Sequence, residues 1–390
     1  MVNKQFLGAN KANYLTFALF AVWINMLRRC ITMLQMVNAK NLKKFISLVL
    51  QRVGLSMKEA EITSDVLVSA NLYGVDSHGI SLIETYIRRI NEGGIKINPK
   101  RNIEKINGFV EMIDASGGIG PVTASLATER VIKMAKEDGV GTVMVKNSNH
   151  IGMLGYYANM IAENEMIGIV LTNSGPNVAA WGGAEAVLGN NAIAVSVPGR
   201  HEISFLLDIA SGEVACGKVR TALEKGDKKI PFGWIVDKDG RDTDSPLDFL
   251  SGGVVLPFGK HKGYGIGMLI DLFTGVLSGG LYASQVKKQR DDYSSVAESS
   301  HTFIGIRINL FMELEQFFCR IEDWVALIKS SKRAEGIEEI LIPGERELRS
   351  YQKKIIEGIN LDQKQIAILN NLGRQYNLDT CILQKKNRRE

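Results

Sequence analysis

The feature that most constrains the fold of this chain is an alternation of short apolar runs with helical patterns between residues 109 and 209. Apolar runs bounded by glycine, proline or asparagine are typical of strands, and apolar residues at three- and four-residue spacing are typical of helices. The sequence predicts strands at 109–113, 141–145, 167–171, 192–197 and 203–209. It predicts helices at 122–136 and 154–163, so a sheet covered by helices is expected.

Helical patterns flank this middle part on both sides. Residues 40–91 have helical spacing, with Ser56 as an N-cap and Glu59 placed to complete a capping box. Later segments predict a glycine-rich, buried helix at 263–277, a strand at 303–308, and helices at 311–330, 346–357 and 361–372. We therefore predict a mixed α/β (α+β) protein. Its α/β domain spans 101–299, and a discontinuous helix-rich domain is formed by 36–100 and 300–390.

Residues 1–35 stand apart from this pattern. Their apolar run at 14–27 is shorter than the ~20 residues that span a bilayer, and it ends in Arg28 and Arg29 without a small-residue cleavage site. We interpret the segment as an extension outside the fold, or as the result of a start codon assigned too early, with Met36 opening the folded part. A membrane anchor or a secretion signal is the alternative.

The net charge of +5 does not indicate a nucleic-acid-binding surface, because the basic excess lies at the two ends of the chain. Residues 1–44 carry seven Lys and Arg and no acid, and the segment between the two ends is mildly acidic. The four cysteines and five histidines are dispersed, without metal-ligand spacing. We expect no metal, no nucleic-acid partner, no membrane partner and a reducing, cytoplasmic location.

A glycine-rich turn at 116–122 follows the first predicted strand and invites a dinucleotide-binding interpretation. The Rossmann fingerprint would need a third glycine where Thr123 stands, and the strand that ends near Asn147 carries no acid for a ribose. Glycines also serve ordinary turns. A dinucleotide site at this turn is the weaker of two alternatives.

Four polar segments interrupt the apolar pattern, mostly next to strand ends or helix starts, where α/β proteins build sites. They are residues 76–79 (DSHG), 147–152 (NSNHIG), 172–176 (TNSGP) and 257–265 (PFGKHKGYG). His78 and His150 each follow a polar cluster, and a histidine titrates near neutral pH, so either could exchange a proton with an alcohol or alkoxide. Each could equally be a structural histidine.

Two charged residues are further candidates. Asp208 ends an apolar strand, and its carboxylate would suit either ribose hydroxyls or a helix N-terminus. Lys262 stands among glycines, where it could hold a phosphate or carboxylate, or simply be solvated.

Taken in order, these segments resemble the malate/L-lactate dehydrogenase family of NAD(P)-dependent oxidoreductases, which is not of the Rossmann type. The likeness covers about residues 36–375 and includes DSHGI, NSNHIG, TNSGP, WGGAEAVLGNNAIAVSVPG, DIASG, LPFGKHKGYGIGMLIDL and AEGIEEILIPGERE. Seven motifs in sequence are more specific than any one of them.

The resemblance implies a homodimer that transfers a hydride between NAD, or alternatively NADP, and C2 of a small 2-hydroxy or 2-oxo acid. It implies a non-Rossmann dinucleotide-binding domain, with His78 or His150 as the proton donor or acceptor. The cofactor contacts that it implies are Ser174, Asp208, Ile209, Ala210, His261, Lys262, Gly344, Glu345 and Arg346.

One departure from the family pattern concerns the substrate. Relatives commonly have arginine four residues after the SHG histidine, where it could grip a carboxylate, and this chain has Leu82. Arg88 or Arg89 could compensate. Two alternatives to a malate- or L-lactate-type dehydrogenase therefore stay open: a reductase of a cyclic imine or sugar-derived 2-oxo acid, and a non-catalytic homologue.

Overall fold

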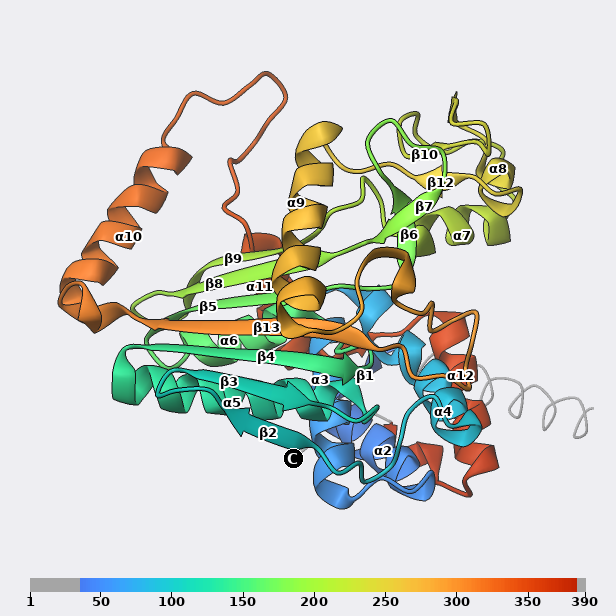
Figure 1. Ribbon diagram of the computed structural model, residues 1–390, viewed down its shortest axis with the longest axis horizontal. Helices are drawn as coiled ribbons and strands as arrows, with labels where there is room; N and C mark the ends of the chain where they lie inside the picture. The colour runs from blue at the N-terminus through green and yellow to red at the C-terminus, as the bar shows by residue number, and fades with distance from the viewer. Residues whose placement is uncertain (1–35, 384–390) are drawn as a thin grey trace, which may run out of the picture.

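The computed structural model describes residues 36–383, and the predictions for residues 1–35 fall outside this range. Within it, the largest element is a seven-stranded sheet in the order β2-β3-β4-β13-β5-β8-β9 (Figure 1). Its pairs are antiparallel except β3 with β4. The strands are β2 (Asn102–Lys105), β3 (Val110–Asp114), β4 (Val140–Ser148), β13 (Ser299–Arg307), β5 (Met166–Thr172), β8 (Ala192–Pro198) and β9 (Ile203–Ala210).

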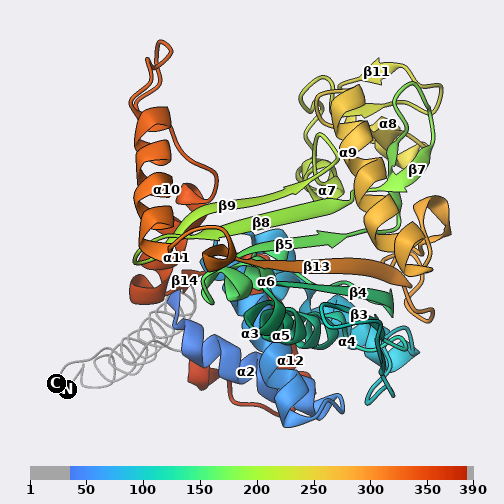
Figure 2. The same ribbon diagram turned by 60° about the vertical axis from the view of Figure 1, so that its left-hand side comes forward.

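Two helices pack on one face of this sheet, α5 (Gly120–Asp138) and α6 (Leu154–Ala162) (Figure 2). The buried core between them includes Val131, Tyr157, Val170 and Phe303. Buried and partly buried residues largely alternate along β3 and β5, which explains why the sequence pattern predicted both strands.

A smaller sheet stands at one end of the large one, in the order β11-β10-β12-β6-β7. Its strands are β6 (Pro176–Ala179), β7 (Ala186–Gly189), β10 (Ile235–Val236), β11 (Asp242–Thr243) and β12 (Val254–Val255). Helices α7 (Cys216–Lys225) and α8 (Pro246–Leu250) lie beside it, around a separate cluster that contains Val178, Val219 and Ile235.

The two ends of the described chain form a helical part together. Its core joins residues from α2 (Ala39–Arg52), α3 (Met57–Leu72), α4 (Ile83–Glu92) and α12 (Gln363–Gln375). Strand β1 (Met36–Val37) pairs with β14 (Ile359–Asn360) and ties the two ends together. No helix in residues 36–383 is long and apolar enough to cross a membrane.

The mixed α/β class predicted from the sequence is confirmed, and three details differ. The strand expected at 303–308 is β13, which lies in the middle of the large sheet although the predicted boundary at 300 assigned it to the helix-rich domain. The division into domains otherwise stays a prediction. Ser56 does cap α3, but the Glu59 side chain accepts from the Ser56 hydroxyl and from Arg101 instead of closing a capping box.

The glycine-rich helix expected to be buried is the third difference. It forms α9 (His261–Asp271) and continues as a π-helical turn, η3 (Leu272–Val276). Gly267 faces inward, close to Ser211, whereas the other side of the helix is open. Leu269, Leu272 and Leu277 are 45%, 49% and 59% exposed. Composition predicted burial because it cannot show that only one side of the helix meets the sheets.

The glycine turn at 116–122 is used for packing. The carbonyl oxygens of Gly117 and Gly118 both accept from the Asn149 side chain. A Cβ on Gly120, at the start of α5, would lie 2.1 Å from the His150 carbonyl oxygen. The segment around His150 therefore covers this helix start, in the place where the alternative interpretation put a dinucleotide.

We expect Gly120→Ala to destabilise the fold by about 1–3 kcal/mol, because the added methyl group meets backbone that cannot move freely. Thermal or denaturant unfolding measures this loss. The control is Gly217→Ala, in α7, where nothing lies within 4 Å of an added Cβ. Equal stability of the two variants would contradict the packing role of Gly120.

Candidate active site

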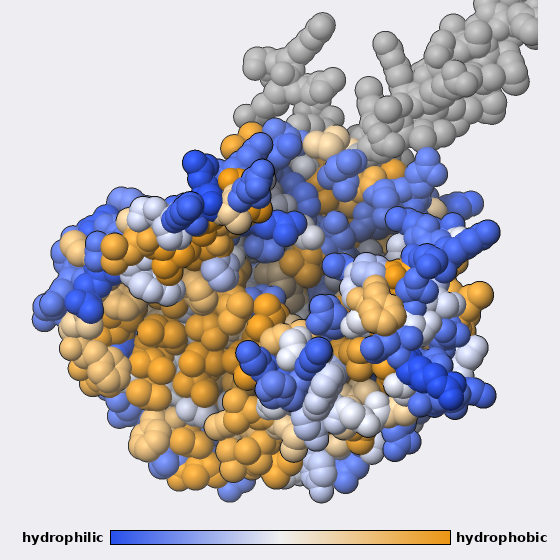
Figure 3. All heavy atoms as spheres, turned by 90° about the horizontal axis from the view of Figure 1, so that it is seen from above, coloured by the Kyte–Doolittle hydropathy of each residue, from blue (hydrophilic) through white to orange (hydrophobic). Residues whose placement is uncertain are grey.

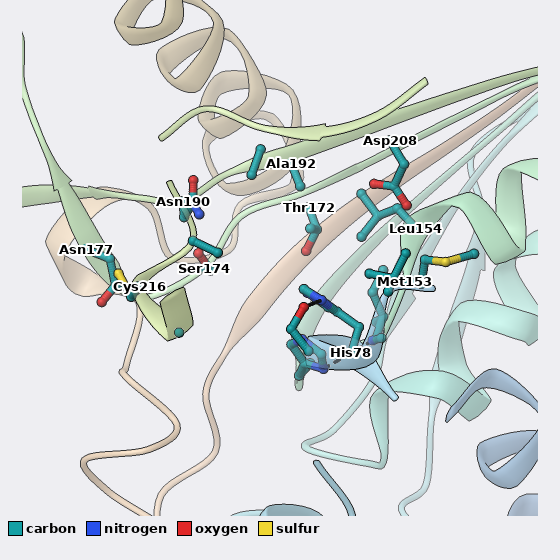
Figure 4. A pocket seen from close by; sticks show the side chains of 18 of the residues that line it. His78, Met153, Leu154, Thr172, Ser174, Asn177, Asn190, Ala192, Asp208 and Cys216 are labelled. Atoms are coloured by element: carbon teal, nitrogen blue, oxygen red, sulfur yellow. Dashed lines mark hydrogen bonds between the residues drawn. The ribbon is translucent and has the colours of Figure 1, made fainter. Parts of the chain in front are cut away.

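A cavity of about 550 Å³ lies where the large sheet, the helical part and the small sheet meet (Figure 4). Three of the four polar segments contribute residues to its wall, namely 76–79, 147–152 and 172–176. The segment 257–265, which the structure also describes, contributes none. In Figure 4, His78 lies on one side of the cavity, and Ser174, Asn177 and Asn190 lie together on another. Clefts of this size, with a few convergent polar groups in a mainly apolar wall, are typical small-molecule sites.

His78 is placed by a buried asparagine. Asn71 donates to the Asp76 carboxylate at 2.6 Å and accepts from the Ile80 backbone N–H at 2.9 Å. A Cβ on Gly79 would lie 2.2 Å from the Asn71 side-chain oxygen, so only glycine allows this arrangement. The DSHG segment thus forms a short 3-10 turn, Asp76–His78, that presents His78 to the cavity.

His150 is held by its backbone neighbours and by a tyrosine. The Gly152 N–H donates to His150 Nδ1 at 3.1 Å, and the buried Tyr86 hydroxyl lies 2.8 Å from the same nitrogen. Because Nδ1 accepts from a backbone N–H, the proton of the neutral ring is on Nε2. The ring is therefore fixed in one tautomer.

The two histidines form a stacked pair. Their ring centroids are 5.4 Å apart, with an interplanar angle of 25°. Removal from water lowers the pKa of His78 to about 4, and the positive charge of Arg290 acts in the same direction. Removal from water and the neighbouring His78 and Arg290 hold the pKa of His150 well below its ordinary value. Both rings are therefore neutral at pH 7.

Asp208 caps a helix and also lies on the cavity wall. Its Oδ2 accepts from the Gly155 N–H at 2.8 Å, so it caps the N-terminus of α6 from a strand far away in the sequence. The same side chain lines the cavity. Loss of solvent around the carboxylate raises its pKa to about 6, and Glu347 adds to this.

The structure separates the other predicted cofactor contacts into two groups. Ser174, Ile209, Ala210 and Gly344 line the cavity. Gly344 has a φ of +95°, and a Cβ there would lie 2.6 Å from the Leu206 side chain, so glycine is required. Four predicted contacts are not on the cavity wall within residues 36–383: His261, Lys262, Glu345 and Arg346.

These four residues have other surroundings. His261 and Lys262 are exposed at the N-terminus of α9. The Glu345 carboxylate pairs with Lys329 at 2.6 Å and accepts from the Ile342 N–H. Arg346 is exposed on α11 (Glu345–Glu357). Their role toward a cofactor stays a prediction.

Neither arginine suggested as a substitute at Leu82 reaches the cavity. Leu82 itself lines it and is buried. Arg88 pairs with Glu92 at 2.7 Å and lies over the Tyr293 ring. Arg89 is fully buried, and the terminal nitrogens of its guanidinium donate hydrogen bonds to backbone carbonyls and to the Asn149 side chain.

Three residues of this site were not singled out by the sequence patterns. Tyr86 lies within a helical apolar pattern and gave no signal of its own. His301, buried on β13, has its Nδ1 2.7 Å from the hydroxyl of the cavity residue Thr172. Arg290 belongs to a run of charged residues that reads as an exposed loop. Only long-range contacts bring these three near His78 and His150.

Comparisons with known proteins point to one family over most of the chain. The family model described as malate/L-lactate dehydrogenase matches residues 37–370. The chain is 37% identical over 342 residues to a malate dehydrogenase of Pyrococcus horikoshii, covering 86% of this chain and 94% of that protein.

Solved structures agree with this. The fold is similar to that of a sulfolactate dehydrogenase from Methanocaldococcus jannaschii, with a TM-score of 0.82, 37% identity and coverage of 88% and 98%. It is also similar to a delta1-piperideine-2-carboxylate reductase from Pseudomonas syringae, with a TM-score of 0.78, 25% identity and coverage of 87% and 99%. This chain belongs to the malate/L-lactate dehydrogenase family and is an oxidoreductase.

Proposed function

We propose that the protein oxidises a small 2-hydroxy acid, or reduces the corresponding 2-oxo acid, with a nicotinamide cofactor. The observation that carries the proposal is the stacked pair His78 and His150 on the wall of a cavity that also holds Asp208 and Ser174. When bound, the nicotinamide supplies or accepts the hydride at C2 of the acid. The chain must then bind the acid and exchange a proton with its C2 oxygen.

A histidine of the pair performs the proton exchange in this proposal. A neutral ring accepts the hydroxyl proton of a 2-hydroxy acid, and the protonated ring returns it in the reverse direction. His78 is our first choice. The neutral His150 ring carries its proton on Nε2, and its Nδ1 already accepts from the Gly152 N–H, so this ring has no free nitrogen to accept the proton of a 2-hydroxy acid. Tyr86 then acts as a positioning residue for His150.

The cavity residues fit a dinucleotide. Asp208 Oδ1 has no hydrogen-bond donor among the described residues, so it can accept from ribose hydroxyls. Such a carboxylate favours NAD over NADP, whose 2′-phosphate it would repel. Ser174 and Gly344 line the same cavity, and Arg220, which also lines it, supplies a positive charge for phosphates. NAD is therefore the proposed cofactor, with NADP as the alternative.

The reaction class can be tested by following NADH and NADPH oxidation in parallel with oxaloacetate, pyruvate, sulfopyruvate and a cyclic imino acid. We expect turnover of a 2-oxo acid, with NADH preferred because of Asp208. The second candidate function is reduction of a cyclic imine, which Leu82 and the likeness to the piperideine-carboxylate reductase support. Preferential turnover of the cyclic imino acid would favour that function. No turnover together with no cofactor binding would contradict the proposal.

The proton-exchange role predicts that His78→Ala lowers turnover by about 10²–10⁴-fold. Binding of NADH, measured by its fluorescence, should change little, because the ring acts on the acid. His201→Ala is the matched control, since His201 is exposed and outside the cavity. Loss of turnover in His150→Ala alone would move the role to His150. Full turnover in both variants would overturn the assignment.

We further propose that the protein is a homodimer that buries the outer side of α9 and η3. Apolar side chains gather over a broad area of the surface seen in Figure 3. Those of α9, η3 and the residue after them are Ile266, Met268, Leu269, Leu272, Phe273, Val276 and Leu277, each at least a third exposed. A contiguous apolar surface of this kind is typical of a protein interface.

Sedimentation should therefore give a mass twice that of the chain, and Leu272→Glu should shift it toward the monomer. A charge placed in an apolar interface is costly, because it loses its water without gaining a partner. Met57→Glu, at an exposed site on α3 away from this surface, is the control. A monomeric wild-type protein would contradict the dimer.

A further inference from the structure

A 2-oxo acid carries a carboxylate, and the cavity must supply a positive charge to hold it. The cations on the described part of its wall are Arg220, Lys287, Lys288 and Arg290. The Lys287 ammonium already pairs with Glu298 at 3.1 Å. Arg290 makes no hydrogen bond or ion pair with any residue in 36–383, so its planar guanidinium is available for a bidentate contact.

The loop that carries Arg290 is held in place by hydrogen bonds from the buried Arg89. Arg89 donates to the carbonyl oxygens of Gln289 at 2.9 Å, Asp292 at 2.7 Å and Ser295 at 2.7 Å. These acceptors lie on both sides of Arg290 in the sequence. The backbone at Arg290 is thus held against the helical part, on the side of the cavity where the histidines lie.

Arg290 lines the same cavity as both histidines. In agreement with this placement, its positive charge contributes to lowering the pKa of His78 and of His150. Leu82 lines that space as well and offers no charge. Of the cations on the described part of the cavity wall, Arg290 is the one among the main causes of the lowered pKa of both histidines.

We propose that Arg290 is the substrate-binding residue that holds the carboxylate of the 2-hydroxy or 2-oxo acid beside the His78–His150 pair. The inference rests on the proposed function, because it names the residue that orients the acid for that reaction. An anion bound to Arg290 neutralises the charge that opposes protonation of the histidines. Binding of the acid therefore raises the proton affinity of the residue that must exchange a proton with it.

The test compares Arg290→Met and Arg290→Lys with the wild-type protein at saturating cofactor. We expect Arg290→Met to lower kcat/KM for the acid by about 10²-fold, with the affinity for NADH unchanged. Arg290→Lys should retain part of the activity, because it keeps the charge and loses the fork. The acid limb of the kcat/KM profile for 2-hydroxy acid oxidation should move to higher pH in Arg290→Met, since removal of a positive charge raises a histidine pKa.

Arg88→Met is the matched control, because Arg88 packs on the same loop through Tyr293 without lining the cavity. An equal loss in Arg88→Met and Arg290→Met would show that loosening of the loop causes the effect, and would overturn the proposal. Unchanged kcat/KM and pH profile in Arg290→Met would overturn it too.

Calorimetric binding of oxalate, an unreactive dicarboxylate, separates this inference from the proposed function. If the wild-type protein turns over no acid but binds oxalate, and Arg290→Met weakens that binding about 10²-fold while Arg88→Met does not, Arg290 is a carboxylate site and the proposed reaction is wrong. Equal oxalate binding by wild type and Arg290→Met, or none by the wild type, would overturn the assignment of Arg290.

Discussion

The architecture of the site depends on the burial of one guanidinium group. Arg89 is fully buried, and a buried charge is costly unless it is hydrogen-bonded. Both terminal nitrogens of its guanidinium have acceptors, whereas Nε has none among the described residues. Its acceptors are the backbone carbonyls of Gly94, Gln289, Asp292 and Ser295 and the side chain of Asn149. Helix α4, the segment after β4 and the loop before β13 are thereby joined at one point, although up to about 200 positions separate them in the chain.

Asn149 extends this connection to the sheet. Its side-chain oxygen accepts from Arg89 and from the Ala297 N–H, and its nitrogen donates to the Gly117 and Gly118 carbonyls. His150 follows directly, so its position depends on all of these bonds. Asn173, in the TNSGP segment, also holds backbone in place, because its nitrogen donates to the Leu281 carbonyl and its oxygen accepts from the Ser300 N–H. Asn71, which lies just before the DSHG segment, does the same for the Ile80 N–H. The chemistry is left to the few groups that face the cavity.

The charges on the cavity wall act together. Loss of water and the charge of Arg290 keep His78 and His150 neutral, and loss of water raises the pKa of Asp208 to about 6. Each shift disfavours the charged form of a group that a bound ligand would re-stabilise. A cavity built in this way favours ligands that bring an anion to Arg290 and hydroxyl groups to Asp208, which agrees with an acid and a ribose.

The sequence by itself determined the elements, the family and the pair of histidines. Strand alternation and the Ser56 cap are local signals, because they reflect the conformation of a few adjacent residues. Only the tertiary structure decided which charged groups face one another. Arg89 and Arg290 look alike in sequence, and Leu269 and Ile270 are both apolar, yet one of each pair is buried and the other is exposed. Burial and ionic partners are set by segments far apart in the chain, and no local pattern records them.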